Sequence, residues 1–408
     1  MAAVALVGTL DTKGADFAFL AARLRAAGAD VITVDAGTGE PDGLTPDIDG
    51  DMVAAAAGTT RAALREAGDR GRAVTEMGRG AALVVADLVA QGRVGGVLSA
   101  GGSGGSSIAA QVMAGLPVGL PKLLVSTMAS GDVSPYVGAK DVCVMYSVVD
   151  VAGVNRISRL VLGNAAAAMA GMVAARSQAD AASADDRPLV AASMFGVTTP
   201  AVETARSRLA DLGYEVLVFH ASGAGGRALE ALAEARLVSG VLDLTTTELA
   251  DDLVGGVLSA GPDRLSAAGA AGLPQVIAPG ALDMVNFGPP STVPERFSGR
   301  LFFEHNPTVT LMRTTPEEMA ELGARIGRKA VAANGPVEVF WPDRGVSALD
   351  ADGQPFRDLA ADEACREALE RELTAAGLTL RRVDANINDP AFAAMMADRL
   401  HQMISDGS

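Results

Sequence analysis

The sequence predicts an α/β protein of two Rossmann-like, doubly wound domains with parallel sheets, related by internal duplication. Three observations indicate this fold. The chain has 408 residues, more than a single hydrophobic core usually organises. Residues 4–35 have the pattern of a strand, a polar turn, a helix and a second strand, which is a βαβ beginning. The octapeptide VGGVLSAG of residues 94–101 recurs unchanged at residues 254–261.

The first half alternates strands and helices along its length. An apolar strand at residues 4–7 precedes the turn GTLDTKG, a helix and the strand VITVD. Residues 94–101 have the pattern of a buried strand and lead directly into GGSGG and a helix over 106–114. The segment GLPKLLV at 119–125 predicts the next strand, and residues 164–179 predict a closing helix.

The second half begins like the first, with a strand at 189–192, a polar turn, a helix and a strand. GLPQVIA at 272–278 matches GLPKLLV of the first half. A capping box with a proline at 315–318 predicts the start of a later helix. The predicted organisation is a nucleotide-binding domain over 1–179, a linker of small polar residues over 180–187 and a second, substrate-binding domain over 188–408.

Composition and charge restrict the function classes. The formal net charge is −16 without a block of Lys or Arg, which argues against binding to nucleic acid or anionic lipid. The two cysteines, Cys143 and Cys365, form no CxxC motif, and the three histidines have no metal-binding spacing. Because no apolar run reaches roughly 18 residues and the start lacks a basic signal region, we expect a cytoplasmic protein without a membrane segment.

A glycine-rich loop joins the buried strand 94–101 to the next helix. Unpaired N–H groups and the helix dipole favour a phosphate in front of such a loop. It matches neither the Walker motif nor GxGxxG, and a tight turn that needs glycine is the alternative. At the second octapeptide, GPDRL of residues 261–265 would crowd a phosphate, which favours a site in the first half only. The expected phosphate contacts are Gly101, Gly102, Ser103, Gly104, Gly105 and Ser106.

Charged residues near this loop would complete a nucleotide site. Lys13 follows the first strand, so it should emerge at the same edge of the sheet and neutralise a phosphate. Asp11 beside it could hold Mg²⁺. Arg72, with Asp69 and Arg70 in the segment GDRGR ahead of a helix, is a further candidate for the same anion. A solvated polar surface is the alternative for these residues.

Polar clusters in the second half could bind a substrate and move protons. Asp243 and Glu248 belong to LDLTTTE, whose hydroxyls and carboxylates suit a sugar-like or carboxylated small molecule. His220 and His305 each end a strand-like run, where a proton-transfer group is useful, and a structural role is their alternative. Residues 222–226 form a second candidate anion nest.

Long motifs in a fixed order show that the sequence resembles a known family. GTLDTKG, LSAGGSGGSS, TTTELADD, HNPTVTLMRTTPEE and GVSALDADGQPF resemble the family of the tomato mosaic virus resistance protein, and the resemblance covers nearly the whole chain. It implies an ATP-binding first domain, a second Rossmann-like domain and a homodimer, with Lys13 and residues 101–106 as nucleotide contacts. One departure is Asn386, at a position where the family usually has histidine.

Together these features predict an ATP-binding protein, an ATP- and Mg²⁺-dependent enzyme of small-molecule metabolism whose active site lies between the two domains. Its reaction would be phosphoryl transfer or the ligase-type activation of a carboxylated substrate. Two alternatives stay open. One is a hydrolase or lyase that acts on a phosphorylated or carboxylated metabolite without ATP turnover. The other is a nucleotide-gated binding or inhibitory protein.

Overall fold

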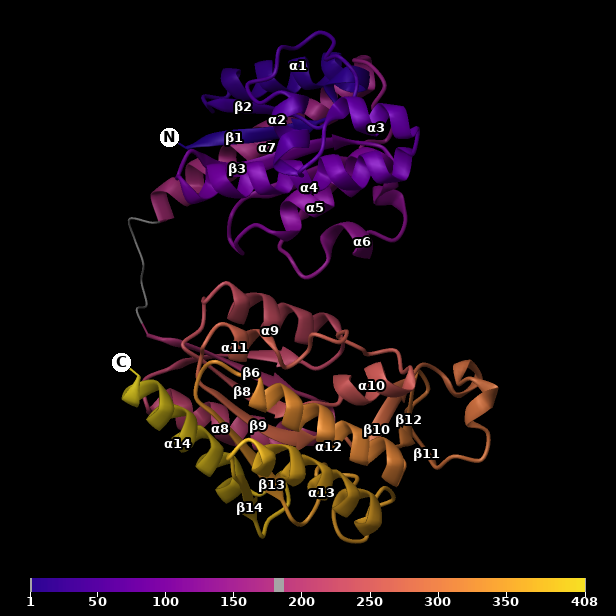
Figure 1. Cartoon of the computed structure of the whole chain (residues 1–408), viewed down its shortest axis with the longest axis vertical. Coiled ribbons are helices and arrows are strands. Elements are labelled where there is room, and N and C mark those ends of the chain that lie inside the picture. The colour runs from indigo at the N-terminus through magenta and orange to yellow at the C-terminus, as the bar shows by residue number, and fades with distance from the viewer. Residues whose placement is uncertain (1, 180–186, 408) are drawn as a thin grey trace. The chain divides into compact units, whose positions relative to one another are not determined.

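The computed structural model describes residues 2–179 and 187–407. The chain forms two compact units, Met1–Asp185 and Asp186–Ser408 (Figure 1). The linker expected over 180–187 lies, except for residue 187, outside the described residues. Each unit has its own parallel sheet and its own hydrophobic core.

The first unit is built on a five-stranded parallel sheet. Its strands are β1 (Ala3–Gly8), β2 (Val31–Asp35), β3 (Val94–Gly101), β4 (Lys122–Ser126) and β5 (Cys143–Tyr146). In the order β2-β1-β3-β4-β5, β1 and β3 are neighbours and the chain proceeds outward from them in both directions. A topological switch point therefore lies between the carboxyl ends of β1 and β3, which is where sheets of this kind bind ligands.

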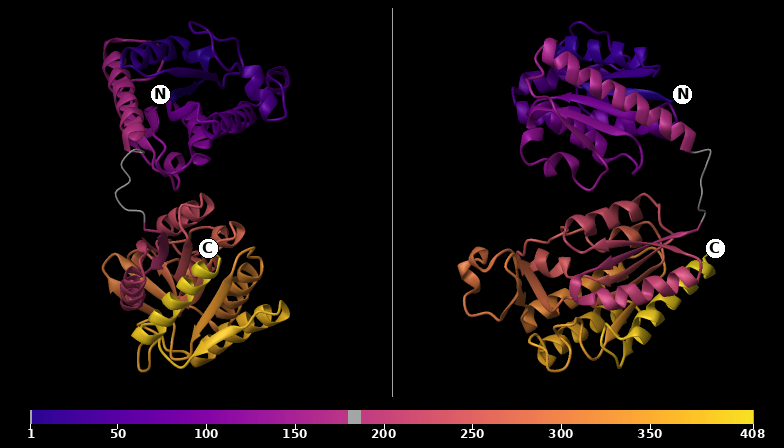
Figure 2. Two further views of the ribbon diagram at one scale, coloured as in Figure 1. Left: turned by 90° about the vertical axis from the view of Figure 1, so that its left-hand side faces the viewer. Right: turned by 180° about the vertical axis from the view of Figure 1, so that it is seen from behind.

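Helices cover both faces of this sheet (Figure 2). They are α1 (Leu10–Ala26), α2 (Gly50–Ala56), α3 (Arg61–Ala67), α4 (Arg70–Ala90), α5 (Ser103–Ala114), α6 (Ser134–Val137) and α7 (Arg156–Ala179). The alternation of side chains along β1 assigns the faces. Val4 and Leu6 pack with α1 and α7, whereas Ala5 and Val7 pack with α2, α4 and α5. Burial of each valine or leucine stabilises the fold by roughly 1.5–3 kcal/mol.

Residues Arg156–Ser177 of α7 are long and apolar enough, by length and composition, to cross a membrane. The helix packs against β1 and β3 through a buried stripe that includes Leu162, Ala166 and Met169. Since a core helix of an α/β domain passes the same test, the stretch is weak evidence for a membrane span.

The second unit contains a six-stranded parallel sheet. Its strands are β6 (Leu189–Met194), β7 (Glu215–His220), β8 (Gly240–Thr245), β9 (Gln275–Gly280), β13 (Val337–Pro342) and β14 (Leu380–Val383). Their order, β7-β6-β8-β9-β13-β14, repeats the order of the first sheet and adds one strand at its end. The predicted α/β fold of two Rossmann-like domains is therefore confirmed.

Helices again cover both faces of the sheet, and a small antiparallel sheet extends the unit. The helices are α8 (Thr199–Asp211), α9 (Ala224–Glu234), α10 (Glu248–Val254), α11 (Ala267–Ala270), α12 (Pro316–Val331), α13 (Leu359–Ala375) and α14 (Pro390–Asp406). α8 packs with α14 on one face, and α12 packs with α13 on the other. The antiparallel strands are β10 (Met284–Phe287), β11 (Phe302–Asn306) and β12 (Val309–Arg313). As expected from the sequence, a capping box between Thr315 and Glu318 starts α12.

The repeated octapeptide has different structures at its two positions. The first copy is β3, but the second starts at Val254, the last residue of α10, and continues as irregular chain to Gly261. Gly255 ends α10 with a φ of 94°, which glycine adopts readily. A short run of small apolar residues can form either a strand or a loop, and its contacts with the rest of the protein determine which of the two it adopts. The recurrence of the octapeptide predicts a strand at residues 254–261 like the one at 94–101, and the structure shows that this prediction was wrong. In the strand order of the second sheet, β8 occupies the position that β3 has in the first. The segment that corresponds to the glycine loop is therefore residues 246–248, which follow β8, and not GPDRL.

Candidate functional site

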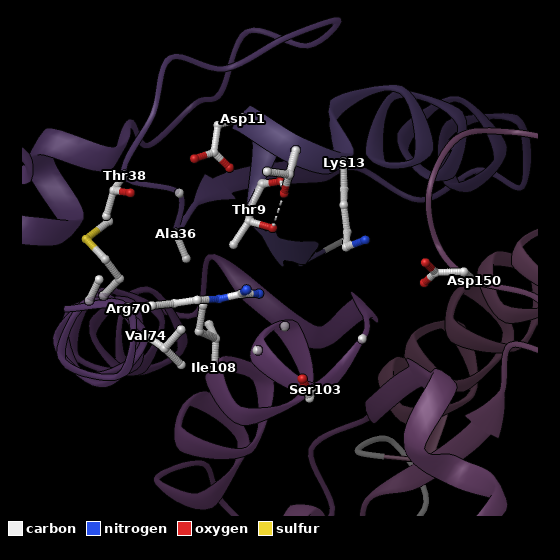
Figure 3. A pocket seen from close by; sticks show the side chains of 17 residues that line it. Thr9, Asp11, Lys13, Ala36, Thr38, Arg70, Val74, Ser103, Ile108 and Asp150 are labelled. Atoms are coloured by element: carbon white, nitrogen blue, oxygen red, sulfur yellow. Dashed lines mark hydrogen bonds between the residues drawn. The ribbon is translucent and has the colours of Figure 1, made fainter. Parts of the chain in front are cut away.

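A cavity of about 500 Å³ lies in the first unit at the carboxyl ends of the central strands (Figure 3). The turns after β1, β2 and β3 all contribute to its wall, so it occupies the topological switch point of the sheet. Asp11 and Lys13 line it together with residues 102–105 of the glycine loop. The structure therefore brings most of the predicted nucleotide contacts to one cavity.

The glycine loop places a helix terminus at this cavity. β3 ends at Gly101 and α5 begins at Ser103, so the chain passes from strand to helix within one residue. The first N–H groups of a helix have no acceptor within the helix, and the N-cap residue, Gly102, has no side chain to supply one. The helix dipole adds about half a positive charge at this end. The terminus of α5 is therefore suited to an anion.

The backbone conformation of the loop does not explain its glycines. None of the glycines at 101–105 has a positive φ. A Cβ added at Gly102, Gly104 or Gly105 would meet its nearest neighbour at 3.6, 3.7 and 3.5 Å, which are ordinary contacts. At Gly101 the added Cβ would lie only 3.1 Å from the Cα of Gly105. A tight turn accounts for Gly101, whereas the missing side chains at the other three positions leave space that the protein itself does not fill.

Two cationic side chains reach the cavity. Lys13 interrupts the helical conformation of α1 with φ −133° and ψ 19°, and its Nζ donates a hydrogen bond to the carbonyl of Val151. Within the described residues the side chain of Arg70 makes no hydrogen bond and no ion pair. Its Nη2 lies 4.0 Å from the position of a Cβ at Gly104. Figure 3 shows the two cations entering the cavity from opposite sides, above the glycine loop.

Arg72 and Ser106 lie outside the cavity wall. Two residues along a helix correspond to a rotation of roughly 200°, so Arg72 faces away from the side on which Arg70 enters the cavity. Its backbone N–H is capped by Asp69 Oδ1 at 3.0 Å, and its side chain is exposed. Ser106 is buried behind the loop, where its Oγ lies 2.7 Å from Ser126 Oγ and ties α5 to β4. Arg70 therefore takes the place for which the sequence favoured Arg72.

Two carboxylates, those of Asp11 and Asp150, also line the cavity. Asp11 accepts a hydrogen bond from the N–H of Gly39 through Oδ2 at 2.8 Å. Its Oδ1 is buried and has no hydrogen-bond partner among the described atoms. Asp150 lies beside Lys13 at the other end of the cavity (Figure 3). The free oxygen of Asp11 is the stronger candidate for a metal ion, because an unpaired buried carboxylate oxygen is costly.

Asp35 holds the turns that shape the cavity, a role that sequence reasoning missed. It ends β2 and is fully buried. Its Oδ1 accepts hydrogen bonds from the N–H groups of Leu10 at 3.0 Å and Gly37 at 2.8 Å. Burial raises the pKa of Asp35 above its ordinary value, although these two bonds oppose the shift. The position after β2 at the carboxyl edge of the sheet was the signal that could have found it.

Comparison with known proteins identifies the family. Residues 2–178 match the model described as "Uncharacterised protein family (UPF0261) N-terminal domain", and residues 187–404 match that of the C-terminal domain. The chain belongs to the UPF0261 family. A UPF0261 protein of Clostridium tetani is 47% identical over 98% of both chains, and one of Rhizobium meliloti is 49% identical over 96% of this chain and 97% of its own. The ToMV resistance protein Tm-1 of Solanum lycopersicum is 44% identical over 74% of this chain and 41% of its own length. The resemblance noted in the sequence is therefore confirmed.

In the second unit of this UPF0261 chain, Asp243 and Glu248 belong to a buried ion cluster around Arg264. The side chains of all three are fully buried. Arg264 Nη2 lies 2.5 Å from Asp243 Oδ1, and its Nε lies 2.7 Å from Glu248 Oε2. Its Nη1 also contacts Glu230 Oε1 at 3.0 Å. The remaining oxygen of Asp243 accepts from Gln275 at 2.9 Å. The two acids that the sequence analysis proposed as catalytic are thus ion-paired with Arg264, which belongs to the GPDRL segment.

The expected anion nest at residues 222–226 is occupied by the chain itself. Glu248 Oε1 accepts hydrogen bonds from the N–H groups of Gly223 at 2.7 Å and Gly226 at 3.0 Å, at the start of α9. The nest therefore binds an internal carboxylate.

The two candidate catalytic histidines lie on different elements. His220 ends β7 and stacks on Phe195 with ring centroids 5.3 Å apart. His305 is exposed on β11, in the antiparallel sheet. Within the described residues no hydrogen bond joins either imidazole to Asp243 or Glu248. The structure does not assemble these four residues into one catalytic group.

Asn386, the departure from the usual histidine, holds a turn together. Its Nδ2 donates to the carbonyls of Arg344, Gly345 and Ser347 at 3.1, 3.2 and 3.3 Å. Its Oδ1 accepts from the N–H of Asn388 at 3.0 Å. The amide thus positions the loops after β13 and β14.

A group of buried acids in the second unit binds protons near neutral pH. Burial, and next the charge of Asp350, raises the pKa of Asp283 to about 7 and that of Asp362 to about 8. Arg313 Nη2 lies 3.1 Å from Asp362 Oδ1, and Arg357 Nη1 lies 2.6 Å from its Oδ2. Two guanidinium groups thus face three carboxyl groups, so a proton on the cluster relieves repulsion.

We expect the second unit to lose stability between pH 6 and pH 8. A raised pKa in the folded state means that this stabilisation is complete below the ordinary aspartate pKa of about 4 and is lost as pH rises to 7 or 8, by up to about 1.4 kcal/mol per pH unit for each proton that only the folded state holds. Fluorescence of Trp341, the only tryptophan and 2% exposed, reports urea unfolding of this unit in the full chain. Asp283→Asn should reduce the slope, and the exposed Asp384→Asn should not. A flat profile for the unaltered protein would contradict the assignment.

Proposed function

We propose that the first unit binds ATP as its Mg²⁺ complex, with the phosphates on the N-terminus of α5. The observation that carries this proposal is the space left by Gly102, Gly104 and Gly105. The turn itself does not require these glycines, and that space opens onto a cavity with two cations. The cavity lies at the switch point of the sheet, where nucleotides bind to folds of this class. The net charge of −16 makes such a local concentration of positive groups necessary for a polyanion.

The residues present suit a Mg²⁺ ion that is held partly by phosphate. Mg²⁺ is usually bound by one or two carboxylates together with substrate phosphates and waters. Within the described residues no group of three or more His, Cys, Asp or Glu side chains is placed to hold a metal. Asp11 supplies one free buried oxygen. An ion that arrives with the nucleotide and is held by Asp11 fits this donor set.

The chain's own groups would then act on the charge of the phosphates. Lys13 and Arg70 offset it, and the N–H groups of α5 donate to phosphate oxygens. These contacts stabilise the charge that develops in phosphoryl transfer, so we propose an ATP-dependent enzyme of small-molecule metabolism. Bound Mg²⁺ would supply the Lewis acid for such a reaction.

A nucleotide-gated binding protein is the second candidate. Asp243 and Glu248 are both paired with Arg264, which leaves neither as a free general base. The printed name of the tomato relative, a ToMV resistance protein, describes resistance and no reaction. Incubation with ATP and Mg²⁺ together with a metabolite library separates the two candidates. Product formation supports the enzyme, and tight binding without turnover across the library supports the binding protein.

Lys13→Ala is expected to remove most of the stabilisation by ATP. A ligand at 100 times its Kd stabilises the folded state by about 2.7 kcal/mol, so ATP with Mg²⁺ should raise the melting temperature of the unaltered protein. Lys140 lies outside the cavity wall in the same unit, which makes Lys140→Ala the matched control. Each variant is compared with its own melting temperature without ligand. An equal ATP shift in Lys13→Ala and Lys140→Ala would remove Lys13 from the site.

A further inference from the structure

The antiparallel sheet of the second unit carries a groove on one of its faces. In Figure 1 its strands β10, β12 and β11 lie at one end of the unit, with the loop that joins β10 to β11 beyond them. This loop contains two short 3₁₀ turns, η3 (Pro290–Thr292) and η4 (Glu295–Phe297). Phe297 packs against Phe287 of β10 with ring centroids 5.4 Å apart, so the loop folds back onto the sheet. A groove of about 440 Å³ is lined by both the loop and the strands.

The register of the strands determines which side chains form the floor of this groove. Thr310 of β12 lies opposite Glu304 of β11 and opposite Phe287 of β10. Residues directly opposite each other in antiparallel strands share a face of the sheet, and so do alternate residues along one strand. Phe302, two residues before Glu304, therefore lies on the same face, whereas Phe303 lies on the other face in a different apolar cluster. Phe302, Glu304 and Thr310 thus form the floor.

The walls of the groove are mostly apolar. The loop contributes Pro290, Val293, Pro294 and Phe297, and β11 contributes Phe302. Of these five residues only Phe297 is buried, so the others leave apolar surface accessible to a ligand. Ligand pockets in proteins usually have volumes of about 300–1,000 Å³ and are lined mainly by hydrophobic and aromatic side chains. The size and the walls of the groove therefore suit a small molecule with an aromatic ring.

The polar groups of the groove have no partner in the described part of the chain. The side chains of Glu295 and Glu304 form no hydrogen bond and no ion pair there. Arg296, the neighbour of Glu295, lies over the ring of Phe297 at 4.7 Å from its centroid, and none of the described residues that line the groove is basic. Thr310 is 2% exposed, and its Oγ1 is buried without a hydrogen-bond partner among the described atoms. A buried hydroxyl without a partner is costly, and a ligand with a positively charged donor would satisfy it together with the carboxylates.

We propose that this groove binds a small aromatic amine, with the ring against the prolines and phenylalanines and the ammonium group beside Glu304 and Thr310. An ammonium group carries three donors and no acceptor, and its hydrogen bonds to a carboxylate are stronger than those between neutral groups. A ligand with a carboxylate or phosphate group would instead meet two acids of the same charge. This site lies in the second unit, and it does not depend on the nucleotide site proposed for the first.

The first test compares phenethylamine with phenylacetate, which share the ring and differ in the sign of the charge, and with ethylamine, which lacks the ring. Each compound is titrated to millimolar concentration against the full chain in buffer without nucleotide, and binding is followed by ligand-observed NMR. We expect phenethylamine to bind about tenfold more tightly than either of the other two compounds. Absence of phenethylamine binding, or an equal affinity for phenylacetate or for ethylamine, would overturn the proposal.

The second test changes the polar groups of the floor. Glu304→Gln is expected to weaken phenethylamine binding about tenfold, because a neutral acceptor of the same shape replaces a charged one. Glu203→Gln is the matched control, since Glu203 is exposed, has no partner within the described residues of the same unit and lies outside the groove. The control variant should bind phenethylamine like the unaltered protein. Equal affinities of Glu304→Gln and Glu203→Gln would contradict the assignment.

Thr310→Val separates a ligand contact from a purely structural role. Valine has the shape of threonine and suits a strand, so removal of an unpartnered hydroxyl should leave the melting temperature equal or higher. The same variant should bind phenethylamine more weakly than the unaltered protein does. A lower melting temperature with unchanged phenethylamine affinity would show that Thr310 serves the fold alone, and it would overturn the proposed contact.

Discussion

Replacing Arg264 by leucine is expected to destabilise the second unit by about 3–5 kcal/mol, because it leaves buried carboxylates without their partner. Although burial lowers the pKa of Arg264, the charges of Asp243, Glu230 and Glu248 raise it well above its ordinary value. The cluster therefore contains a permanent positive charge. The midpoint of urea unfolding, followed by the fluorescence of Trp341, measures the effect in the full chain.

The control for this change is Arg227→Leu. Arg227 is exposed and donates one hydrogen bond, to the carbonyl of Ser259 at 3.1 Å. Surface substitutions of this kind usually change stability by less than about 0.5 kcal/mol. A loss below about 1 kcal/mol for Arg264→Leu would show that the cluster does not hold the fold, and Asp243 and Glu248 would return as candidates for chemistry.

Gly104→Leu is expected to lower the affinity for ATP by about 100-fold without destabilising the first unit. Gly104 lies in the first turn of α5 with an ordinary helical conformation, so a side chain there gains helix propensity of about 0.5–1 kcal/mol. The new side chain points toward Val74 and Arg70, into the space assigned to phosphate. Loss of two hydrogen bonds to a charged group, at about 1.5 kcal/mol each, corresponds to this factor.

Gly171→Leu is the matched control for this experiment. Gly171 lies in α7, and a Cβ there would meet no other atom within 4 Å. Both variants should melt at or above the temperature of the unaltered protein, but only Gly104→Leu should lose ATP, as measured by titration calorimetry. Retention of ATP affinity by a folded Gly104→Leu protein would mean that the phosphates do not lie on this loop.

The sequence predicted the fold and most of the first-unit site because these depend on local patterns. A buried strand followed by glycines and a helix predicts a terminus at the carboxyl edge of a sheet, and Lys13 and Asp11 follow a neighbouring strand toward the same edge. Arg70 and Arg72 could both be named as candidates from the sequence. Only their different positions around the axis of α4 determine which of them faces the cavity. The stripe formed with Val74 and Met77 carried that information.

The second unit was harder to predict because its polar residues pair across long separations in the chain. Arg264 comes from an irregular segment and contacts Asp243 and Glu248 on two other elements, a pairing that no local pattern indicates. The identical octapeptides were misleading for a related reason. The same eight residues form β3 in one setting and a helix end with a loop in the other, so tertiary context decided their structure.

Hydrogen exchange of the full chain with and without ATP and Mg²⁺ tests the central claim most directly, because it locates the bound phosphates. We expect ATP to slow exchange of the amides at 102–106 and in the turn that contains Lys13. Residues 102–105 and Lys13 line the cavity, and residue 106 adjoins it. Gly104→Leu should abolish this protection. Unchanged exchange at 102–106 under saturating ATP, or protection confined to residues 187–407, would contradict a nucleotide site on the glycine loop.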